Sequence, residues 1–328
     1  MTDLNTQPQQ EAGNRESVLT ECVRAATAAP SLHNSQPWLF RIRQGAVEVY
    51  ADRSRQLEVL DPAGRELLIS VGAALLTLRL ELRAKGYLPA VEMFPEPTRP
   101  DLVARVGVGP AAAPSRTVEA LAAAIPHRHT NRLPFAHSVV PADVIEELTE
   151  AARLEQARLT VADPVSRNAI LNLSQTADRE LRARGGYRAE LARWTLPGTV
   201  RRDGIPPSAF GPWDALECMP IRDFGLLQPQ LHRTTEAFEP YPTIVVLATD
   251  GDTERHWVAA GQALQRVLLT ATWRNLATTP VSQPVEIPAI RQMLTDTTAG
   301  VWPQLVLRLG YGRPAAATPR RPLSEVLV

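Results

Sequence analysis

Apolar residues recur at helical spacing in several stretches of the chain. Between residues 15 and 29, Val18, Cys22, Ala25 and Ala29 fall on one face, and Pro30 helps to stop the helix. A longer helix is predicted from Asp61-Pro62, an N-cap followed by a proline at the first helical position, to Gly86. Further helices are predicted for a short stretch ending at 124, after Pro141, over most of 164–194, and over 253–277.

Alternation of apolar and polar residues, or a short apolar run typical of a buried strand, predicts the strands. Residues 38–53 alternate on both sides of Gln44-Gly45, which predicts a β-hairpin. Other strands are predicted at 101–109, 158–163, 241–250 and 303–312, with loops at 109–115 and 277–287. Each half of the chain has a strand near a long apolar helix, so the order of elements is loosely repeated, although the sequence shows no clean repeat.

One predicted loop, residues 195–242, is unusually long and rich in proline and glycine, as in "LPGTVRRDGIPPSAFGPW". Loops of this length inside compact domains are uncommon and often cover a functional site. We therefore expect a lid over a site, which we call the lid segment (195–240). The alternative is an insertion that packs on the outer helices.

Composition narrows the class of protein. The 328 residues suffice for one large domain or two packed halves, and 44% hydrophobic with 21% charged residues is ordinary for a globular protein. Lys+Arg and Asp+Glu both number 35, so charge favours neither a nucleic-acid nor a membrane partner. Two cysteines, a polar N-terminus and a longest apolar run interrupted by Ser70, Gly72 and Thr77 predict a cytoplasmic protein.

Several kinds of chemistry are disfavoured by the motifs. There is no P-loop and no G-x-S-x-G, and Gly107-Val-Gly109 is followed by Pro110, unlike a dinucleotide fingerprint. His127 and His129 could suggest a metal, but Arg128 lies between them and would repel a cation. We expect no metal site.

Two polar clusters remain as candidates. Arg128, Thr130 and Arg132 alternate, which in an extended segment places two guanidiniums and a hydroxyl on one side, a suitable arrangement for a phosphate. The alternative is a solvated basic loop, and Arg320-Arg321 carries the same ambiguity. The stretch "APSLHNSQPW", residues 29–38, is too rich in donors and acceptors for an ordinary turn, the alternative being a capped helix end with Trp38 in the core.

These clusters carry a resemblance to the nitroreductase flavoprotein family. "AAPSLHNSQPW" resembles that family's A-P-S-x-x-N-x-Q-P-W segment, and "RHTNRLPF" is similar to its R-x-S-x-K/R motif, with Thr130 keeping the hydroxyl of the serine. "LRLGYG" and "PRRPLSEV" resemble its terminal strand, Gly-Tyr turn and Arg-Pro ending. The order of the first two motifs is reversed relative to ordinary members, which resembles the fused, double-length branch typified by the mycobacterial Acg proteins.

The resemblance implies an α+β, nitroreductase-like fold of two pseudo-symmetric halves, each with a mainly antiparallel sheet and long core helices. Residues 1–124 would form the first half and supply the P-S-x-x-N loop. Residues 125–328 would form the second half, with the arginine motif, the lid segment and a C-terminal arm. Ordinary members are homodimers with FMN at the interface, so the fusion implies a monomer with an internal pseudo-dimer and one complete FMN site.

The resemblance also implies roles for individual residues. The 29–38 stretch would cradle the isoalloxazine or the ribityl chain, Arg128 would hold the phosphate near Thr130, Arg132 would lie toward the flavin N1/C2 carbonyl, and 280–283 would face N5. No protein residue is expected to be catalytic, because flavin carries the chemistry. The full cofactor-binding set implied is Pro30, Ser31, Asn34, Gln36, Arg128, His129, Thr130, Arg132, Pro280, Val281, Ser282, Gln283, Arg320 and Arg321.

Two functions stay open at this point. The first is an FMN-dependent oxidoreductase that uses NAD(P)H to reduce or dehydrogenate a small organic substrate by hydride transfer through flavin N5. The second is an FMN-sequestering protein whose site is sealed by the lid segment and catalytically poor. Movement of residues 195–240 would distinguish them.

Overall fold

The computed structural model describes residues 7–195, 201–295 and 300–328, and it has an α+β fold with two four-stranded sheets. Every pairing in both four-stranded sheets is antiparallel. The first sheet has the order β1 (Trp38–Arg43), β2 (Ala46–Ala51), β4 (Leu102–Ala111), β3 (Tyr87–Met93). The second has the order β5 (Arg158–Val161), β8 (Thr243–Thr249), β10 (Trp302–Gly310), β9 (Ala277–Pro280).

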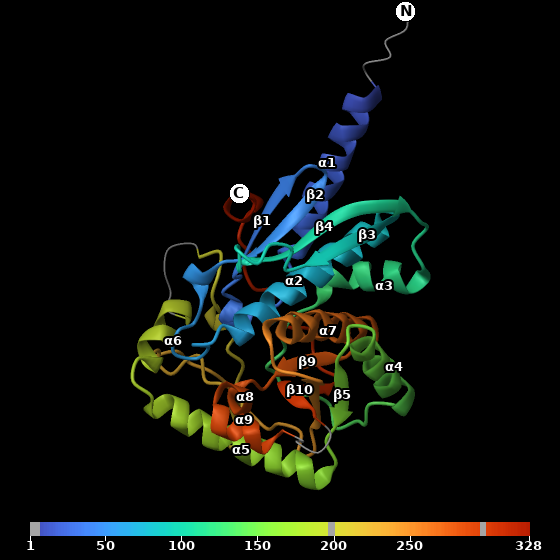
Figure 1. Cartoon of the computed structure of the whole chain (residues 1–328). Coiled ribbons are helices and arrows are strands. Elements are labelled where there is room, and N and C mark those ends of the chain that lie inside the picture. Colours follow the sequence, from blue (N-terminus) through green and yellow to red (C-terminus); the bar gives the residue numbers. More distant parts are fainter. Residues whose placement is uncertain (1–6, 196–200, 296–299) are drawn as a thin grey trace, which may run out of the picture.

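The helices surround and separate these sheets (Figure 1). They are α1 (Gln7–Ala26), α2 (Arg65–Ala84), α3 (Arg116–Ala124), α4 (Ala142–Arg153), α5 (Pro164–Ala183), α6 (Tyr187–Thr195), α7 (Glu254–Trp273), α8 (Gln283–Glu286), α9 (Pro288–Met293) and α10 (Leu323–Val326). Two short strands, β6 (Trp213–Asp214) and β7 (Thr235–Glu236), pair with each other in the lid segment.

Helices α2 and α7 lie between the two sheets and cross at very short range (Figure 1). A Cβ atom on Gly72 would lie 2.2 Å from the carbonyl oxygen of Val258, and one on Gly261 would lie 2.0 Å from that of Ile69. The crossing therefore requires glycine on both helices. Each glycine is the eighth residue of a 20-residue helix, so the two helices meet at equivalent positions.

The two sheets share one topology. Helix α2 follows β2 and precedes β3, just as α7 follows β8 and precedes β9, and the strand orders correspond. We propose that these units are the two halves expected at 1–124 and 125–328. The C-terminus crosses this boundary, because the Val328 amide donates to the Phe40 carbonyl at 2.8 Å beside β1.

The hydrophobic pattern missed some elements. Strands β3 and β9 were not predicted, and β4 continues to Ala111, inside the predicted loop at 109–115. In the described residues β3 pairs with β4 alone, so β3 is an edge strand. Pro89 and the exposed residues of β3 hide the alternation of apolar and polar positions. The helix predicted over 164–194 breaks at Gly185-Gly186, where Gly186 has φ +82°.

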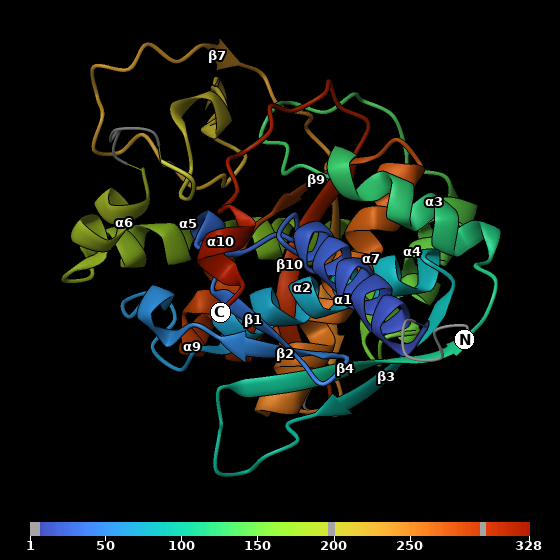
Figure 2. The same cartoon turned by 90° about the horizontal axis from the view of Figure 1, so that it is seen from above.

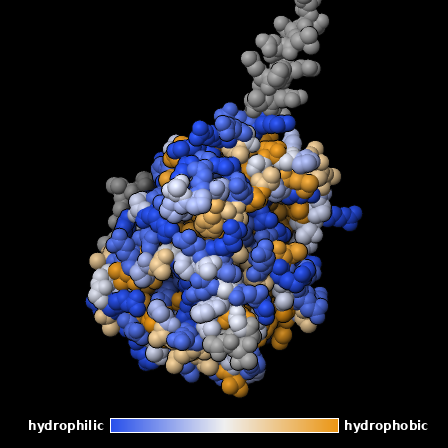
Figure 3. All heavy atoms as spheres, in the orientation of Figure 1, coloured by the Kyte–Doolittle hydropathy of each residue, from blue (hydrophilic) through white to orange (hydrophobic). Residues whose placement is uncertain are grey.

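The face shown in Figure 3 is dominated by hydrophilic residues, with hydrophobic residues among them. In the described ranges no helix combines the length and the apolar character that crossing a membrane demands.

Candidate functional site

A cavity between the two sheet–helix units collects segments that lie far apart in the sequence. The loop before β1, the first turns of α2, the 128–132 segment, the lid segment, the end of β9 and the C-terminal arm all contribute. Ten residues expected to bind the cofactor line it: Pro30, Ser31, Asn34, Arg128, Thr130, Arg132, Pro280, Ser282, Gln283 and Arg320. The fold thus brings the three motifs together; what they bind is taken up below.

The loop before β1 owes its shape to three non-glycine residues in the left-handed region. His33, Asn34 and Gln36 have φ values of 50°, 54° and 51°. Asn tolerates this conformation better than most residues. The Asn34 amide nitrogen donates to the carbonyls of Gly204 at 2.9 Å and Pro319 at 3.0 Å. Asn34 therefore ties the loop to both the lid segment and the C-terminal arm.

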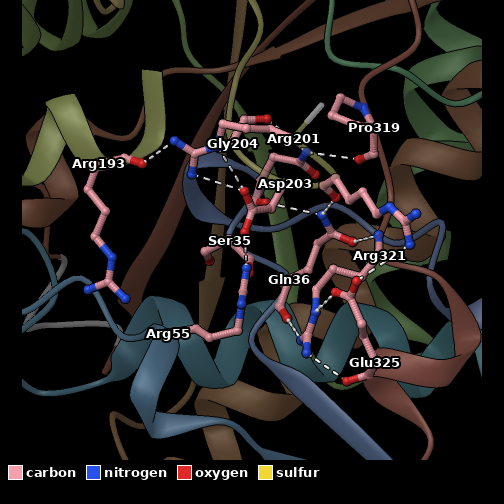
Figure 4. A network of polar contacts seen from close by, with 12 residues as sticks. Ser35, Gln36, Arg55, Arg193, Arg201, Asp203, Gly204, Pro319, Arg321 and Glu325 are labelled. Carbon is pink, nitrogen blue, oxygen red and sulfur yellow. Dashed lines mark hydrogen bonds and ion pairs between the residues drawn. The ribbon is translucent and has the colours of Figure 1, made fainter. Parts of the chain in front are cut away.

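A second network braces the outer side of this loop (Figure 4). The Gln36 side chain donates to the Arg202 carbonyl at 2.9 Å and accepts from the Arg321 amide at 2.8 Å. Arg55 donates to the Ser35 carbonyl and forms an ion pair with Asp203 of the lid segment. Arg321 donates to the Gln36 and Glu325 carbonyls at 3.2 Å and 2.7 Å.

Four of the expected cofactor-binding residues do not line the cavity. Gln36 and Arg321 are occupied by the bracing network just described. Val281 is 1% exposed, and its amide donates to the Val306 carbonyl at 2.9 Å within the core. His129 is half-buried beside Arg128, and burial followed by the Arg128 charge lowers its pKa. Contact between these four and a cofactor remains a prediction.

Arg128 and Arg320 converge on one carbonyl oxygen. Their Nη2 atoms donate to the Ala28 carbonyl at 3.2 Å and 3.3 Å. Both Nε atoms are buried and lack a hydrogen-bond partner in the described ranges, and neither arginine pairs with a carboxylate there. Burial and then Arg320 lower the pKa of Arg128 to about 9, and burial lowers that of Arg320 to about 10. Clustered cations without acids are costly, so this corner is built for an anion.

A second pair of arginines consists of Arg132 and Arg222, which belongs to the lid segment. Arg132 donates to the Ala209 carbonyl at 2.8 Å and lies 4.6 Å from the centre of the Phe224 ring. Burial and then Arg222 lower the pKa of Arg132 to about 10. Arg222 itself is buried in an ion pair with Glu286, and it donates to the Tyr187 hydroxyl at 3.0 Å. Burial alone would lower the pKa of Arg222, but the Glu286 carboxylate raises it above its ordinary value.

Sequence reasoning missed several lining residues. Glu66, in the first turn of α2, is 5% exposed and accepts from Arg65 at 2.7 Å. Burial and then Glu286 raise the pKa of Glu66 to about 8, although Arg65 opposes the rise. The signal available in the sequence was the pair of adjacent charged residues, Arg65 and Glu66, at the start of an otherwise apolar helix. The remaining unassigned lining residues are Leu32, His33, Ile69, Ser70, Ile205, Ile221, Arg222, Phe224, Leu264, Leu305 and Thr318.

The lid segment both packs on outer helices and reaches the cavity. In Figure 2 its described part loops out beside α5 and α6, and residues 196–200 lie outside the described residues. Phe210 and Phe224 are buried against Tyr187 and Trp194 of α6. Ile205, Ile221, Arg222 and Phe224 line the cavity. The packing thus has features of both alternatives, and the role of this segment as a lid remains a prediction.

The described residues hold no group of three or more His, Cys, Asp or Glu side chains that could bind a metal ion. The cavity instead offers guanidinium, amide and hydroxyl donors, which suits an organic anion.

Comparisons with known proteins identify the family. No model of a known protein family matches the chain. A Mycobacterium tuberculosis protein with the provisional name NAD(P)H nitroreductase Rv3131 is 34% identical over 94% of this chain and 90% of its own length. Another, provisionally named NAD(P)H nitroreductase acg, is 32% identical over 94% of this chain and 95% of its own.

Solved structures described as nitroreductases with bound FMN also match. The Bacteroides fragilis protein is 15% identical over 63% of this chain and 94% of that one, with a TM-score of 0.36. The Desulfitobacterium hafniense protein is 13% identical over 64% and 97%, with a TM-score of 0.41. These matches are too distant to add to the sequence relatives. On the strength of those relatives, which align with nearly its whole length, the chain belongs to the nitroreductase flavoprotein family, in its Acg-like branch.

Proposed function

We propose that the cavity binds one FMN per chain and that the protein is an NAD(P)H-dependent oxidoreductase acting on a small organic substrate. The observation that carries this proposal is the convergence of Arg128 and Arg320, whose buried Nε atoms lack partners among the described residues. The names of the M. tuberculosis relatives support the NAD(P)H and nitroreductase parts.

The residues present fit FMN. A phosphate at the Arg128–Arg320 corner would receive charge-assisted hydrogen bonds from both guanidiniums and would satisfy their free Nε atoms. The Thr130 hydroxyl lines the same cavity and can add a further donor.

The remaining lining residues suit the rest of the cofactor. Arg132 would hold positive charge beside the ring system, where reduction adds negative charge. Ile205, Ile221 and Phe224 would exclude water from it. When bound, FMN supplies the chemistry itself, accepting a hydride at N5 and passing electrons onward.

A second candidate function is FMN sequestration, and specific contacts favour it. The lid segment is fixed to the first motif by the Asn34–Gly204 bonds and to α8 by the Arg222–Glu286 ion pair. If these contacts persist in solution, substrate has little access and turnover is slow.

One experiment tests the cofactor and separates the two functions. The purified protein is reconstituted with FMN, the unbound flavin is removed, and the absorbance of the bound flavin is followed after NADH or NADPH is added. Rapid bleaching, with recovery on adding a nitroaromatic or quinone, supports the oxidoreductase. Bound flavin that does not bleach supports sequestration, and failure to retain FMN contradicts both.

A further inference from the structure

His33 is a buried histidine that makes no hydrogen bond within the described part of the chain. It is 4% exposed, and neither Nδ1 nor Nε2 has a partner there. Its side chain lines the cavity. Most buried polar side-chain atoms in folded proteins do have a partner. A buried imidazole with two free nitrogens at a cavity wall therefore points to a ligand.

The loop and the lid segment hold the ring in place without bonding its nitrogens. His33 has φ 50° and ψ 24°, and the next residue, Asn34, is fixed by three side-chain hydrogen bonds. The Phe224 ring meets the imidazole edge-on, with centroids 5.2 Å apart and an interplanar angle of 82°. The Arg132 guanidinium lies over the same Phe224 ring, 4.6 Å from its centroid. Phe224 is thus packed against one residue of the 29–38 stretch and one of the 128–132 segment.

The charges around His33 keep it neutral. Burial, then Arg222 and Arg132, hold its pKa well below the ordinary value. The carboxylates nearby are already engaged, Glu286 with Arg222 and Glu66 with Arg65. A neutral imidazole has one N–H donor and one acceptor nitrogen. The two nitrogens point away from each other, so one ligand edge meets only one of them. An uncharged edge that carries a carbonyl beside an N–H suits either nitrogen, because it can accept from the N–H nitrogen or donate to the other.

We propose that His33 is a binding residue of this cavity, that it hydrogen-bonds a neutral amide-type edge of the bound ligand, and that Phe224 positions its ring. This rests on the proposed function, in that FMN is the resident ligand. Two sources have the required chemistry: the pyrimidine edge of the flavin and the carboxamide of the nicotinamide donor. The family resemblance implies a role for the 29–38 stretch as a whole but no particular contact for His33.

Nitrogen NMR of the histidine side chains tests this directly. The chain has six histidines, and the His33 signals are identified by their loss in His33→Asn. Spectra are recorded for the cofactor-free protein, after FMN is added, and after NAD⁺ is added to the FMN-bound protein. A shift of the His33 ring-nitrogen signals with FMN assigns the flavin edge. A shift only with NAD⁺ assigns the carboxamide.

Other outcomes contradict the proposal. If FMN binds and the His33 signals move with neither ligand, only ordered water meets the ring and the inference is wrong, while the proposed function stands. If the protein takes up no FMN, both are contradicted.

Variants provide a second readout. His33→Leu removes the proposed hydrogen bond, whereas His33→Asn keeps a donor and an acceptor and tolerates the positive φ. We expect about a tenfold weaker FMN Kd for His33→Leu if the flavin is the partner, or about a tenfold higher KM for NAD(P)H if the carboxamide is. His33→Asn should recover to within about threefold of wild type.

Two further variants complete the set. The exposed His127→Leu is the control and should match wild type. Phe224→Ala should broaden the His33 signals, because the ring loses its packing partner. Equal Kd and KM for His33→Leu and wild type would overturn the proposal.

Discussion

Two buried arginines in this protein, Arg308 and Arg128, differ in whether a carboxylate neutralises their charge. Arg308, whose side chain is 0% exposed, forms two 2.5 Å hydrogen bonds with the Glu239 carboxylate and lies 3.6 Å from the centre of the Phe135 ring. Arg128 is 3% exposed, yet within the described residues its side chain bonds only the Ala28 carbonyl, and a second arginine lies beside it.

This difference distinguishes an arginine that stabilises the fold from an arginine that is available to a ligand. A buried charge that is matched by an acid belongs to the folded core, since the pair satisfies itself. A buried charge that the protein leaves unmatched costs stability, and it is useful only if something else supplies the opposite charge. Arg128 and Arg320 are of the second kind, which is why we assign them to an anionic ligand.

The largest expected effect comes from breaking the matched pair. Arg308→Met leaves the Glu239 carboxylate buried without its cation, which should lower the free energy of unfolding by about 3–5 kcal/mol. Urea denaturation of the cofactor-free protein measures the loss. The protein that still folds should bind FMN normally, and a loss below about 1 kcal/mol would mean that the pair is not structural.

The unmatched arginine should behave in the opposite way. Arg128→Ala should leave the stability of the cofactor-free protein unchanged or slightly higher, because an uncompensated buried charge is removed. It should weaken FMN binding by about 1.5–3 kcal/mol, roughly 10- to 150-fold in Kd. His127→Ala, an exposed neighbour, is the control. Equal FMN retention by the two variants after dialysis would contradict the assignment.

The pH dependence of stability extends the comparison from buried arginines to a buried acid. Glu66 lines the cavity, and burial and Glu286 raise its pKa to about 8. Between the unfolded value near 4.5 and about 8, the folded state binds more protons than the unfolded state, so stability should fall as pH rises through this window. The slope is at most about 1.4 kcal/mol per pH unit. Glu66→Gln should flatten it in urea melts from pH 5 to 8, and an unchanged slope would show that Glu66 is ionised throughout.

The smallest expected effect is that of Arg321→Ala on FMN binding, compared with the same change at the adjacent Arg320. Arg321 is occupied by Gln36, Asp52 and Glu325, whereas Arg320 lines the cavity. Arg321→Ala should cost about 1 kcal/mol of stability and change the FMN Kd less than threefold. Arg320→Ala should weaken FMN binding by about tenfold or more. If Arg321→Ala lost FMN as readily as Arg320→Ala, the bracing role would be wrong.

The sequence predicts one side of this comparison and not the other. Arg128 stands out because its spacing to Thr130 and Arg132 is local and because the motif is similar to that of a known family. Arg308 sits in an apolar strand pattern, and its partner Glu239 lies 69 residues away in the lid segment, so only the folded chain reveals the pair.

Long-range contacts explain the other omissions as well. The two long core helices and the hairpin follow from periodicity, and the structure confirms them. The predicted start of the first helix at Asp61-Pro62 is wrong, because α2 begins at Arg65 with Gly64 as its N-cap. The closeness of Gly72 and Gly261 depends on how the two helices cross, and the isolation of His33 depends on the lid residue Phe224. Neither can be predicted from neighbours in the sequence.

The central claim is that this single chain builds one FMN site from two halves. The most direct measurement is the molar ratio of FMN to protein in the reconstituted protein, with the mass of the same sample determined by light scattering. We predict one FMN per chain on a monomer, because the α2–α7 crossing already provides the interface between the halves. A ratio near two, or an obligate dimer at low micromolar concentration that holds one FMN between two chains, would contradict the account.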